Sequence, residues 1–473
     1  MKNIFWRYGR KIKKWDDRLL MRSVIFCICV CMAVSAVFVA RADYGLSVPE
    51  TPLASRIAAV VLFGMMLCVC VVFAAYRQPG IREGIKNREA LAHMIIDNGW
   101  YETDLKTNSR GDQNITYMPR LYFWRRHSIT YFPRLYYKRR KGKIYLTVKI
   151  NMSRYQEQLK NLESKVETGL DCELIDKEYK GRWMHYVFVV DVPSHRIKAE
   201  EMTAEKGHIQ FMDYILWDYS YNPHALIVGD TGSGKTWFLL SIIEALLKSG
   251  AGLRIIDAKN ASLAGLSMVL PDVHYDVEGI GDCLVRFYED MMARMAEMKE
   301  KLGRNIQGDY RDCGMKPEFL IFDEYVAYLE MLGKKEWEEA VSVVKKIALL
   351  GRQAGFFLIL TCQRPDAKYL PDGVRMQFGL RIALGTMDAN GYTMIFGSTE
   401  KSFVKKNEKG RGYVSLWNGV ITEFYSPFVS PSHDFMENIS AAYIPGETQA
   451  PPCQSQPAGA QRTDGGAPPA YGV

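Results

Sequence analysis

Hydrophobic and polar residues divide the chain into stretches of different character. Residues 23–40 and 57–76 are apolar runs without a charged residue. At about 1.5 Å per helical residue, each run is about long enough to cross a hydrocarbon layer of ~30 Å. A cleaved signal peptide also has a basic start and an apolar run, but its apolar core is shorter and no second span follows. The pattern therefore predicts a transmembrane hairpin over residues 23–76.

Charged residues around these runs predict the orientation of the hairpin. Residues 1–22 hold eight Lys and Arg, the connection between the runs holds only Arg41 and Arg56, and residues 77–88 hold four more. Because flanking Lys and Arg resist translocation, both ends of the hairpin are expected in the cytoplasm. The sequence thus predicts a cell-membrane protein with two spans, in contact with lipid, whose N- and C-termini are cytoplasmic.

A basic and aromatic stretch precedes a small α+β pattern. Residues 110–143 hold ten Lys and Arg, one acid and eight aromatic residues. This mixture suits single-stranded nucleic acid, anionic lipid headgroups, or the packing of a small sheet. Residues 142–191 then read as a strand, an amphipathic helix over 153–168 and two further strands. We expect a linker and a small α+β domain over residues 77–200.

From about residue 224 onward, short apolar strands alternate with long helical stretches. This pattern is typical of an α/β fold with a parallel sheet covered by helices on both faces. The predicted domain spans residues 201–435. Residues 436–473 are rich in Pro, Gly, Ala and Gln and hold too few large apolar residues to order themselves, so we expect a disordered tail.

Composition narrows the class of protein further. The chain has 473 residues, a net charge of +8 and 48% hydrophobic residues, which excludes wholesale disorder, collagen and a coiled coil. Of its ten cysteines, five lie in the two apolar runs and none forms a CxxC pair. The cysteines therefore support neither a zinc site nor a disulfide scaffold.

A phosphate-binding loop follows the apolar strand 225–228 and precedes the helical run 237–247. The loop is Gly229, Asp230, Thr231, Gly232, Ser233, Gly234, Lys235 and Thr236. A strand, a GxxxxGK[ST] loop and a helix together form the P-loop motif that binds ATP, and this context argues against a plain glycine-rich turn. We predict that Lys235 bridges the β- and γ-phosphates and that Thr236 ligates Mg²⁺.

Two acids end the next strongly apolar run, residues 319–322. Asp323 is expected to hold Mg²⁺ and Glu324 to polarise the attacking water, which makes the predicted protein an ATP hydrolase. Paired acids at a strand end can also be helix N-caps. A further strand, 356–361, ends at Cys362 and Gln363; we expect Gln363 near the γ-phosphate and Cys362 as a small buried residue.

Six short motifs in order resemble the FtsK/SpoIIIE family of ring-forming, ATP-driven DNA pumps, over residues 217–417. They lie at residues 222–224, 256–259, 303–310, 351–355, 361–365 and 381–383. The resemblance implies a RecA-like domain and a homo-hexamer that contacts the DNA backbone without reading its sequence. It also implies that an arginine reaches the next subunit's γ-phosphate. Arg352 and Arg381 are the candidates, and either is equally compatible with a structural ion pair.

Within this family, the predicted spans, the modest length and the α+β module look most like coupling proteins of Gram-positive conjugative elements. Relaxase and mating-channel proteins are the partners that this resemblance implies. The family's Asp-Pro-Lys appears here as Asp257-Ala258-Lys259, and the tail leaves no room for a sequence-reading winged helix. Two alternatives are a type VII-like protein-secretion ATPase and a non-motor membrane tether for DNA or a relaxase. A single P-loop favours the DNA translocase.

Overall fold

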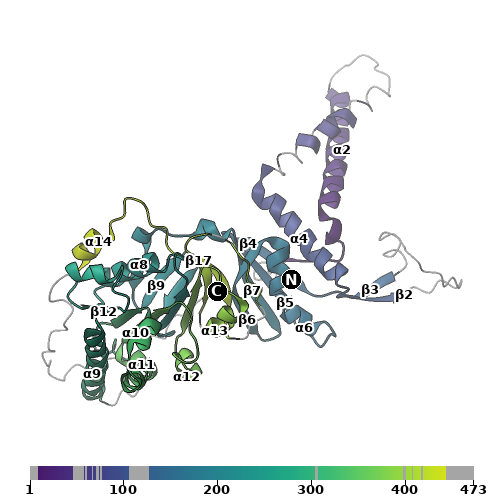
Figure 1. The fold of residues 1–473 in the computed structure, drawn as a ribbon. Helices are drawn as coiled ribbons and strands as arrows, with labels where there is room; N and C mark the ends of the chain where they lie inside the picture. Colours follow the sequence, from purple (N-terminus) through teal and green to yellow (C-terminus); the bar gives the residue numbers. More distant parts are fainter. Residues whose placement is uncertain are drawn as a thin grey trace, which may run out of the picture.

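A computed structural model describes most of the chain. The described residues are 9–45, 58, 61–66, 68–70, 74, 77–105, 127–303, 307–397, 401–406, 408–416 and 419–443. They form a large mixed sheet with helices on both faces, a smaller antiparallel sheet beside it, and the helices α2 and α4, of which α2 projects away from the sheets (Figure 1).

The main sheet has eight strands. In spatial order they are β13 (Val273–His274), β12 (Gly252–Asp257), β14 (Glu318–Asp323), β15 (Phe356–Cys362), β11 (Ala225–Gly229), β16 (Leu380–Leu384), β17 (Arg411–Ser415) and β18 (Ile421–Tyr425). The first six run parallel. Every residue of β11 and β15 is buried, because strands covered on both faces read as continuous apolar runs.

Helices cover both faces of this sheet. They are α8 (Lys235–Lys248), α9 (Val277–Leu302), α10 (Tyr325–Met331), α11 (Lys334–Ala354), α12 (Asp372–Arg375), α13 (Ala389–Phe396) and α14 (Phe435–Ala442). α9 packs on α11 on one side and α14 packs on α8 on the other (Figure 1). Parallel strands need such crossover connections, and the buried face of each helix supplies part of one continuous core.

The predicted parallel sheet is confirmed only in part, because its last two strands are antiparallel. β17 pairs antiparallel with β16 and with β18. The connection between β17 and β18, residues 416–420, is too short for a crossover, so these strands form a hairpin. The fold is therefore α/β with a mixed sheet.

The small sheet has five antiparallel strands. In order they are β1 (Arg10–Lys11), β4 (Leu135–Arg140), β5 (Lys143–Lys149), β7 (Trp183–Val190) and β6 (Cys172–Lys180). Its apolar face packs with α4 (Pro79–Asp97), α6 (Gln156–Lys160) and α7 (Glu163–Leu170). The sequence predicted a single helix over 153–168, whereas two short helices meet at Asn161–Leu162. The sequence pattern did not predict that Arg10 and Lys11, near the N-terminus, would join this sheet as β1.

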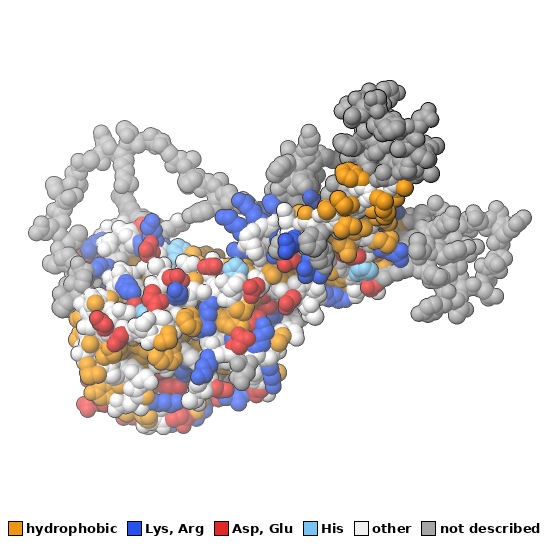
Figure 2. Space-filling view, turned by 90° about the horizontal axis from the view of Figure 1, so that it is seen from above, with side chains coloured by type: hydrophobic (Ala, Val, Ile, Leu, Met, Phe, Trp, Pro, Cys, Tyr) orange, Lys and Arg blue, Asp and Glu red, His pale blue; other side chains and the backbone are white. Residues whose placement is uncertain are grey.

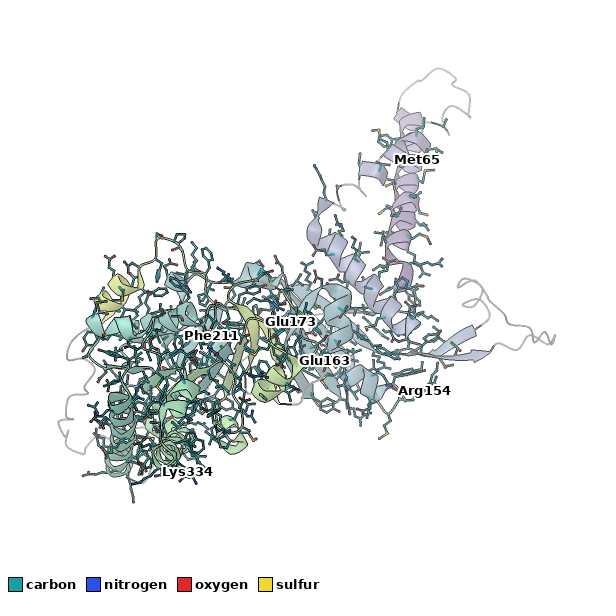
Figure 3. The ribbon with its side chains drawn as sticks, viewed as in Figure 1. Met65, Arg154, Glu163, Glu173, Phe211 and Lys334 are labelled. Carbon is teal, nitrogen blue, oxygen red and sulfur yellow. The ribbon has the colours of Figure 1, made fainter. Side chains whose placement is uncertain are left out.

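Shorter elements complete the described fold. A two-stranded sheet pairs β2 (Glu102–Leu105) with β3 (His127–Tyr131), and a three-stranded sheet has the order β10 (Ile215–Asp218), β9 (His208–Met212) and β8 (Ala204–Glu205). Short 3-10 helices are η1 (Asp16–Arg18), η2 (Val192–His195), η3 (Ala199–Glu201) and η4 (Ala264–Met268). Phe211 and Trp217 of the three-stranded sheet are fully buried in the core of the main body, and Figure 3 labels Phe211 there.

The predicted membrane localisation is wrong. α2 (Leu19–Gly45) overlaps the first predicted span and exposes apolar side chains such as Phe26, seen as the orange surface in Figure 2. Within the part of the chain that the structure describes, however, no helix has both the length and the apolar character needed to cross a bilayer. A two-span protein is therefore not supported. The second predicted span, 57–76, falls largely outside the described residues.

Two other predictions lie partly or wholly outside the described residues. The basic aromatic stretch is described only from residue 127 onward. Of the predicted tail, only residues 436–443 are described, and they belong to α14 and its end. What was expected of residues 110–126 and of residues 444–473 stays a prediction.

A buried charge cluster joins the small sheet to the main one. The Lys401 ammonium lies 2.6 Å from Glu167 and 2.5 Å from Glu173, which Figure 3 places between the two sheets. The Glu423 N–H on β18 donates to the Glu173 carboxylate at 2.8 Å. Burial raises the pKa of Glu173 to about 7. The Lys401 ammonium opposes this shift only in part, because it is shared between the carboxylates of Glu173 and Glu167.

A second buried pair lies within the β17–β18 hairpin. The Arg411 guanidinium donates to Glu423 at 2.8 Å, and the two side chains are 1% and 8% exposed. Burial alone raises the pKa of Glu423, but hydrogen bonds from Arg411 and Lys406 hold it below its usual range. This hairpin therefore depends on a desolvated ion pair.

We expect Arg411→Met to lower the free energy of unfolding by about 3 kcal/mol, because it leaves a buried carboxylate without its main partner. Lys406→Met is the matched control: Lys406 bonds the same carboxylate at 3.0 Å but is 41% exposed, so its loss should cost less than about 1 kcal/mol. Urea unfolding followed by fluorescence measures both values. Equal costs for the two variants would contradict the importance of the buried pair.

Candidate active site

The phosphate loop connects β11 to α8 at the carboxyl edge of the main sheet. Gly232 and Gly234 have φ of 83° and 98°, the left-handed region that glycine adopts without strain. A Cβ at Gly234 would lie 3.3 Å from the Gly410 backbone. No side chain caps the start of α8, so the N–H groups of its first turn remain for an anion. This geometry is suited to phosphate.

A pocket of about 960 Å³ opens above this loop. Of the predicted site residues, it is lined by Asp230, Thr231, Gly232, Gly234, Lys235, Thr236, Asp323, Glu324 and Gln363. Gly229 and Ser233 do not line it. A Cβ at Gly229 would lie 2.7 Å from the Ser233 hydroxyl, so these two residues form the packed floor of the loop. The structure thus brings most of the predicted ligands into one pocket.

The phosphate-loop lysine bonds the predicted catalytic acid. The Lys235 ammonium lies 2.5 Å from the Glu324 carboxylate and 3.8 Å from that of Asp323. All three side chains are about nine-tenths buried, so the charges offset one another out of contact with bulk water. Lys259 adds a second cation, 3.3 Å from the other Glu324 oxygen. Nucleotide phosphates entering the pocket would compete with Glu324 for these two ammonium groups.

Thr361, at the end of β15, connects the two acids. The Glu324 N–H donates to the Thr361 hydroxyl at 3.2 Å, and that hydroxyl donates to the Asp323 carboxylate. Glu324 has a φ of 56°, a left-handed conformation that costs a non-glycine residue roughly 1–3 kcal/mol. Thr361 is fully buried and helps to hold Glu324 in this conformation. No residue pattern near Thr361 predicts this role.

The acids and hydroxyl of the pocket have the chemistry of a magnesium site. Burial raises the pKa of Asp323, and the nearby Lys235 opposes that shift. A divalent cation beside Asp323 would favour its ionised form in the same way. Thr236 supplies a hydroxyl to the same pocket, and Mg²⁺ prefers such oxygen ligands. These residues fit the predicted metal.

Asp257 also lines the pocket but is already committed to the chain's own backbone. Its carboxylate accepts N–H groups from Ala261, Leu263 and Ala264, each at 3.0 Å. The acid therefore shapes the loop after β12, which carries Lys259 toward Glu324.

The C-terminal part of the chain closes the pocket, which sequence reasoning missed. The lining residues there are Lys409, Gly410, His433 and residues 426–431, and Arg196, which precedes the phosphate loop, lines the same pocket. Phe428 is 47% exposed, and the Arg196 guanidinium lies 5.6 Å from its ring centre. The Gly410 N–H donates to the Ser233 carbonyl of the phosphate loop at 3.1 Å. The C-terminal lining residues lie more than 170 positions after the loop, so no local sequence motif predicts that they reach it.

The two candidate arginines do not line this pocket. The Arg352 side chain is exposed and donates to the Ser220 carbonyl at 3.0 Å. Arg381 donates to the carbonyls of Phe378 and Ile395, and burial lowers its pKa. Arg381 thus has structural partners in its own chain, while Arg352 is the more accessible of the two. Their action on a neighbouring subunit stays a prediction.

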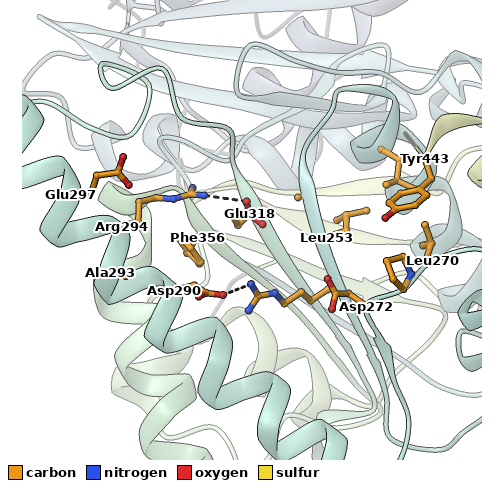
Figure 4. Close-up of a pocket in the computed structure, with 14 residues that line it drawn as sticks. Leu253, Leu270, Asp272, Asp290, Ala293, Arg294, Glu297, Glu318, Phe356 and Tyr443 are labelled. Carbon is orange, nitrogen blue, oxygen red and sulfur yellow. Dashed lines mark hydrogen bonds and ion pairs between the residues drawn. The ribbon is translucent and has the colours of Figure 1, made fainter. Parts of the chain in front are cut away.

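A second pocket, of about 700 Å³, lies at the opposite edge of the sheet (Figure 4). It is lined by Gly252, Glu318 and Phe356, the first residues of β12, β14 and β15. Its arginines are paired: Arg294 lies 3.1 Å from Glu318, and Arg254 bonds an aspartate of α9. Since these cations are neutralised within the chain, this pocket is not suited to a triphosphate.

Strand order, phosphate loop and acid pair define an α/β P-loop enzyme that binds and hydrolyses ATP.

Comparisons with known proteins identify the family. Residues 193–326 match the FtsK/SpoIIIE family. The chain is 42% identical over 368 residues to Ftsk domain-containing protein YdcQ of Bacillus subtilis (strain 168), an alignment that covers 76% of this chain and 74% of YdcQ. The chain therefore belongs to the FtsK/SpoIIIE family, as its motifs predicted.

More distant similarities cover smaller parts. The chain is 24% identical over 204 residues to DNA translocase FtsK of Tropheryma whipplei (strain TW08/27), which is 39% of this chain and 27% of that relative. Among solved structures, the pCW3 conjugation coupling protein TcpA in its monomer form with ATPgS aligns with a TM-score of 0.46 and 21% identity. That alignment covers 65% of this chain and 92% of TcpA.

We expect Thr361→Val to lower kcat for ATP hydrolysis by about 10- to 100-fold, because it leaves the Glu324 N–H and the Asp323 carboxylate without a buried partner worth about 1–3 kcal/mol. ATP affinity should change little, since the phosphate loop is untouched. Thr361→Ser keeps the hydroxyl and is the matched control. Steady-state kinetics together with ATP binding by calorimetry measure the effect; a Val variant with wild-type kcat would contradict the role of Thr361.

Proposed function

We propose that this protein is an ATP-driven DNA translocase that acts as a coupling protein in conjugative DNA transfer. The observation that carries the proposal is the buried contact of Lys235 with the acid pair in a pocket of about 960 Å³ that the phosphate loop also lines. Membership of the FtsK/SpoIIIE family, which includes the DNA translocase relative, supports DNA as the track. The α+β module ahead of the P-loop favours a coupling protein.

Each residue of the site has a role in the proposed hydrolysis. Lys235 leaves Glu324 and binds the β- and γ-phosphates, while backbone N–H groups of the loop hold the remaining phosphate oxygens. Thr236 and Asp323 would hold Mg²⁺, which would neutralise charge on the phosphates. Glu324, released from Lys235, accepts a proton from the attacking water. Gln363 contacts the γ-phosphate or the water.

Assembly would complete this site and couple it to DNA. We propose a homo-hexamer in which an arginine of one subunit stabilises charge at the γ-phosphate of its neighbour. Each arginine donates to a carbonyl of its own chain, but Arg352 is exposed near the end of α11 whereas Arg381 is partly buried, so Arg352 is better placed for this. Lys and Arg facing the central hole would contact DNA phosphates without reading bases. A relaxase and mating-channel proteins are the proposed partners.

The full chain should hydrolyse ATP faster when DNA is added, and the stimulation should fall as salt rises, because phosphate contacts release counterions. Lys235→Ala should lose ATP binding, whereas Glu324→Gln should keep ATP binding and lose hydrolysis by roughly 100-fold or more. Phosphate release with and without DNA measures both effects. Stimulation by a secreted protein but not by DNA would contradict the proposal in favour of protein secretion.

A further inference from the structure

A second charged pocket lies far from the nucleotide, where α2 and α4 meet the small sheet. Its volume is about 1010 Å³. It is lined by Gly9, Arg10, Leu19, Ser23, Gly80, Ile81, Gly84, Ile85, Arg88, Tyr137, Lys138, Arg139 and Arg140. Five of these residues are basic and, among the described residues that line the pocket, none is acidic. Neither the ATPase site nor its chemistry uses this pocket.

Two of the basic residues that line the pocket bond carboxylates that do not line it. Arg139 bonds Glu83, and Arg88 donates to Asp16 at 2.8 Å. Asp16 is buried behind the wall rather than facing the pocket. The Arg88 Nε is buried and has no hydrogen-bond acceptor within the described part of the chain. A buried donor without an acceptor is costly, so this wall is suited to an anion.

The start of α4 adds to this preference. No side chain caps the helix, and its 19 residues direct the positive end of the helix dipole toward the wall that contains Gly80 and Gly84. A Cβ at either glycine would meet nothing within 4 Å. The wall therefore leaves room for a ligand instead of being filled by packing.

The basic surface continues from the pocket onto the other face of the small sheet. Alternation along β4 places Arg139 on the side of α4 and Arg140 on the opposite side, next to Lys143 of β5. Lys11 pairs with β4 on that same face. Burial lowers the pKa of Lys11, and the nearby charges of Arg134 and Lys13 lower it further. The positive charges are thus spread over a distance that a single phosphate group would not span.

We propose that this surface binds the sugar–phosphate backbone of single-stranded DNA, outside the ATP-driven ring. The inference rests on the proposed function, in which DNA is the substrate. Cations spread over both faces of the β-strand β4 match the repeated phosphates of a nucleic acid better than the single phosphate of a lipid headgroup. Tyr145 lies on the outer face of the adjacent strand, where an aromatic ring can stack on an unpaired base.

The test compares Arg10→Gln/Arg140→Gln with a matched control, Lys334→Gln/Lys335→Gln. All four side chains are exposed, and Figure 3 places Lys334 at the end of the molecule opposite α4. Binding of a fluorescent 30-nucleotide single strand to the full chain is measured by anisotropy over a range of salt. We expect the first variant to weaken binding about tenfold and to reduce the slope of log K against log salt by about 1.4. The control should bind as the wild type does.

Other outcomes separate this inference from the proposed function. If the first variant binds the strand as tightly as the wild type, and DNA still stimulates the wild-type ATPase, the surface is not the docking site and the translocase proposal stands. If the wild type neither binds DNA nor responds to it, the proposed function itself fails. Loss of binding to vesicles of anionic phospholipid, with strand binding intact, would assign the surface to lipid and overturn the inference. Basal ATPase should stay unchanged in both variants.

Discussion

The contact between Lys235 and Glu324 is the interaction on which the account of this molecule depends. The contact forms because β11, β15 and β14 are neighbouring strands that run parallel. The phosphate loop after β11 and the acid pair at the end of β14 therefore lie at the same edge of the sheet. Burial of these charges is tolerated because each has a partner of opposite sign. In the proposed mechanism, Lys235 would leave Glu324 for the nucleotide phosphates, and Glu324 would then be able to act on water.

The active site is also connected to the small sheet through the C-terminal hairpin. The Ser426 N–H donates to the Gly410 carbonyl at 2.7 Å, and Gly410 in turn bonds the phosphate loop. Glu423, three residues before Ser426, bonds Glu173 of the small sheet through its backbone. Hydrogen bonds and buried charges therefore join the nucleotide pocket to the domain that carries the basic surface. The nucleotide pocket and the proposed DNA-binding surface are thus linked by one series of hydrogen bonds and ion pairs.

Local motifs made the centre of this site predictable. The phosphate loop and the acids Asp323 and Glu324 stand directly at strand ends, so short stretches of sequence locate them without knowledge of the fold. Thr361 was missed because its importance comes from the register of β14 and β15. The wall that contains Phe428 was missed for a similar reason, since only the folded hairpin brings it to the loop. The roles assigned to individual site residues stay predictions.

The fold was predictable to a comparable degree. Alternating strands and helices indicated the α/β body, yet they did not reveal that β17 and β18 turn back antiparallel, because strand direction depends on connection length and packing. The pairing of Arg10 and Lys11 with β4 joins residues more than 120 positions apart and leaves no local pattern. Apolar runs at 23–40 and 57–76 predicted two membrane spans, and the described helices do not support them.

The most direct test of the central claim is an experimental structure of the full chain with Mg²⁺ and a non-hydrolysable ATP analogue. We expect the triphosphate to lie on residues 229–236, Lys235 to have moved from Glu324 to the β- and γ-phosphates, and the Glu324 carboxylate to face the γ-phosphate. A structure in which Lys235 stays bonded to Glu324, or in which the analogue occupies a different pocket, would contradict it.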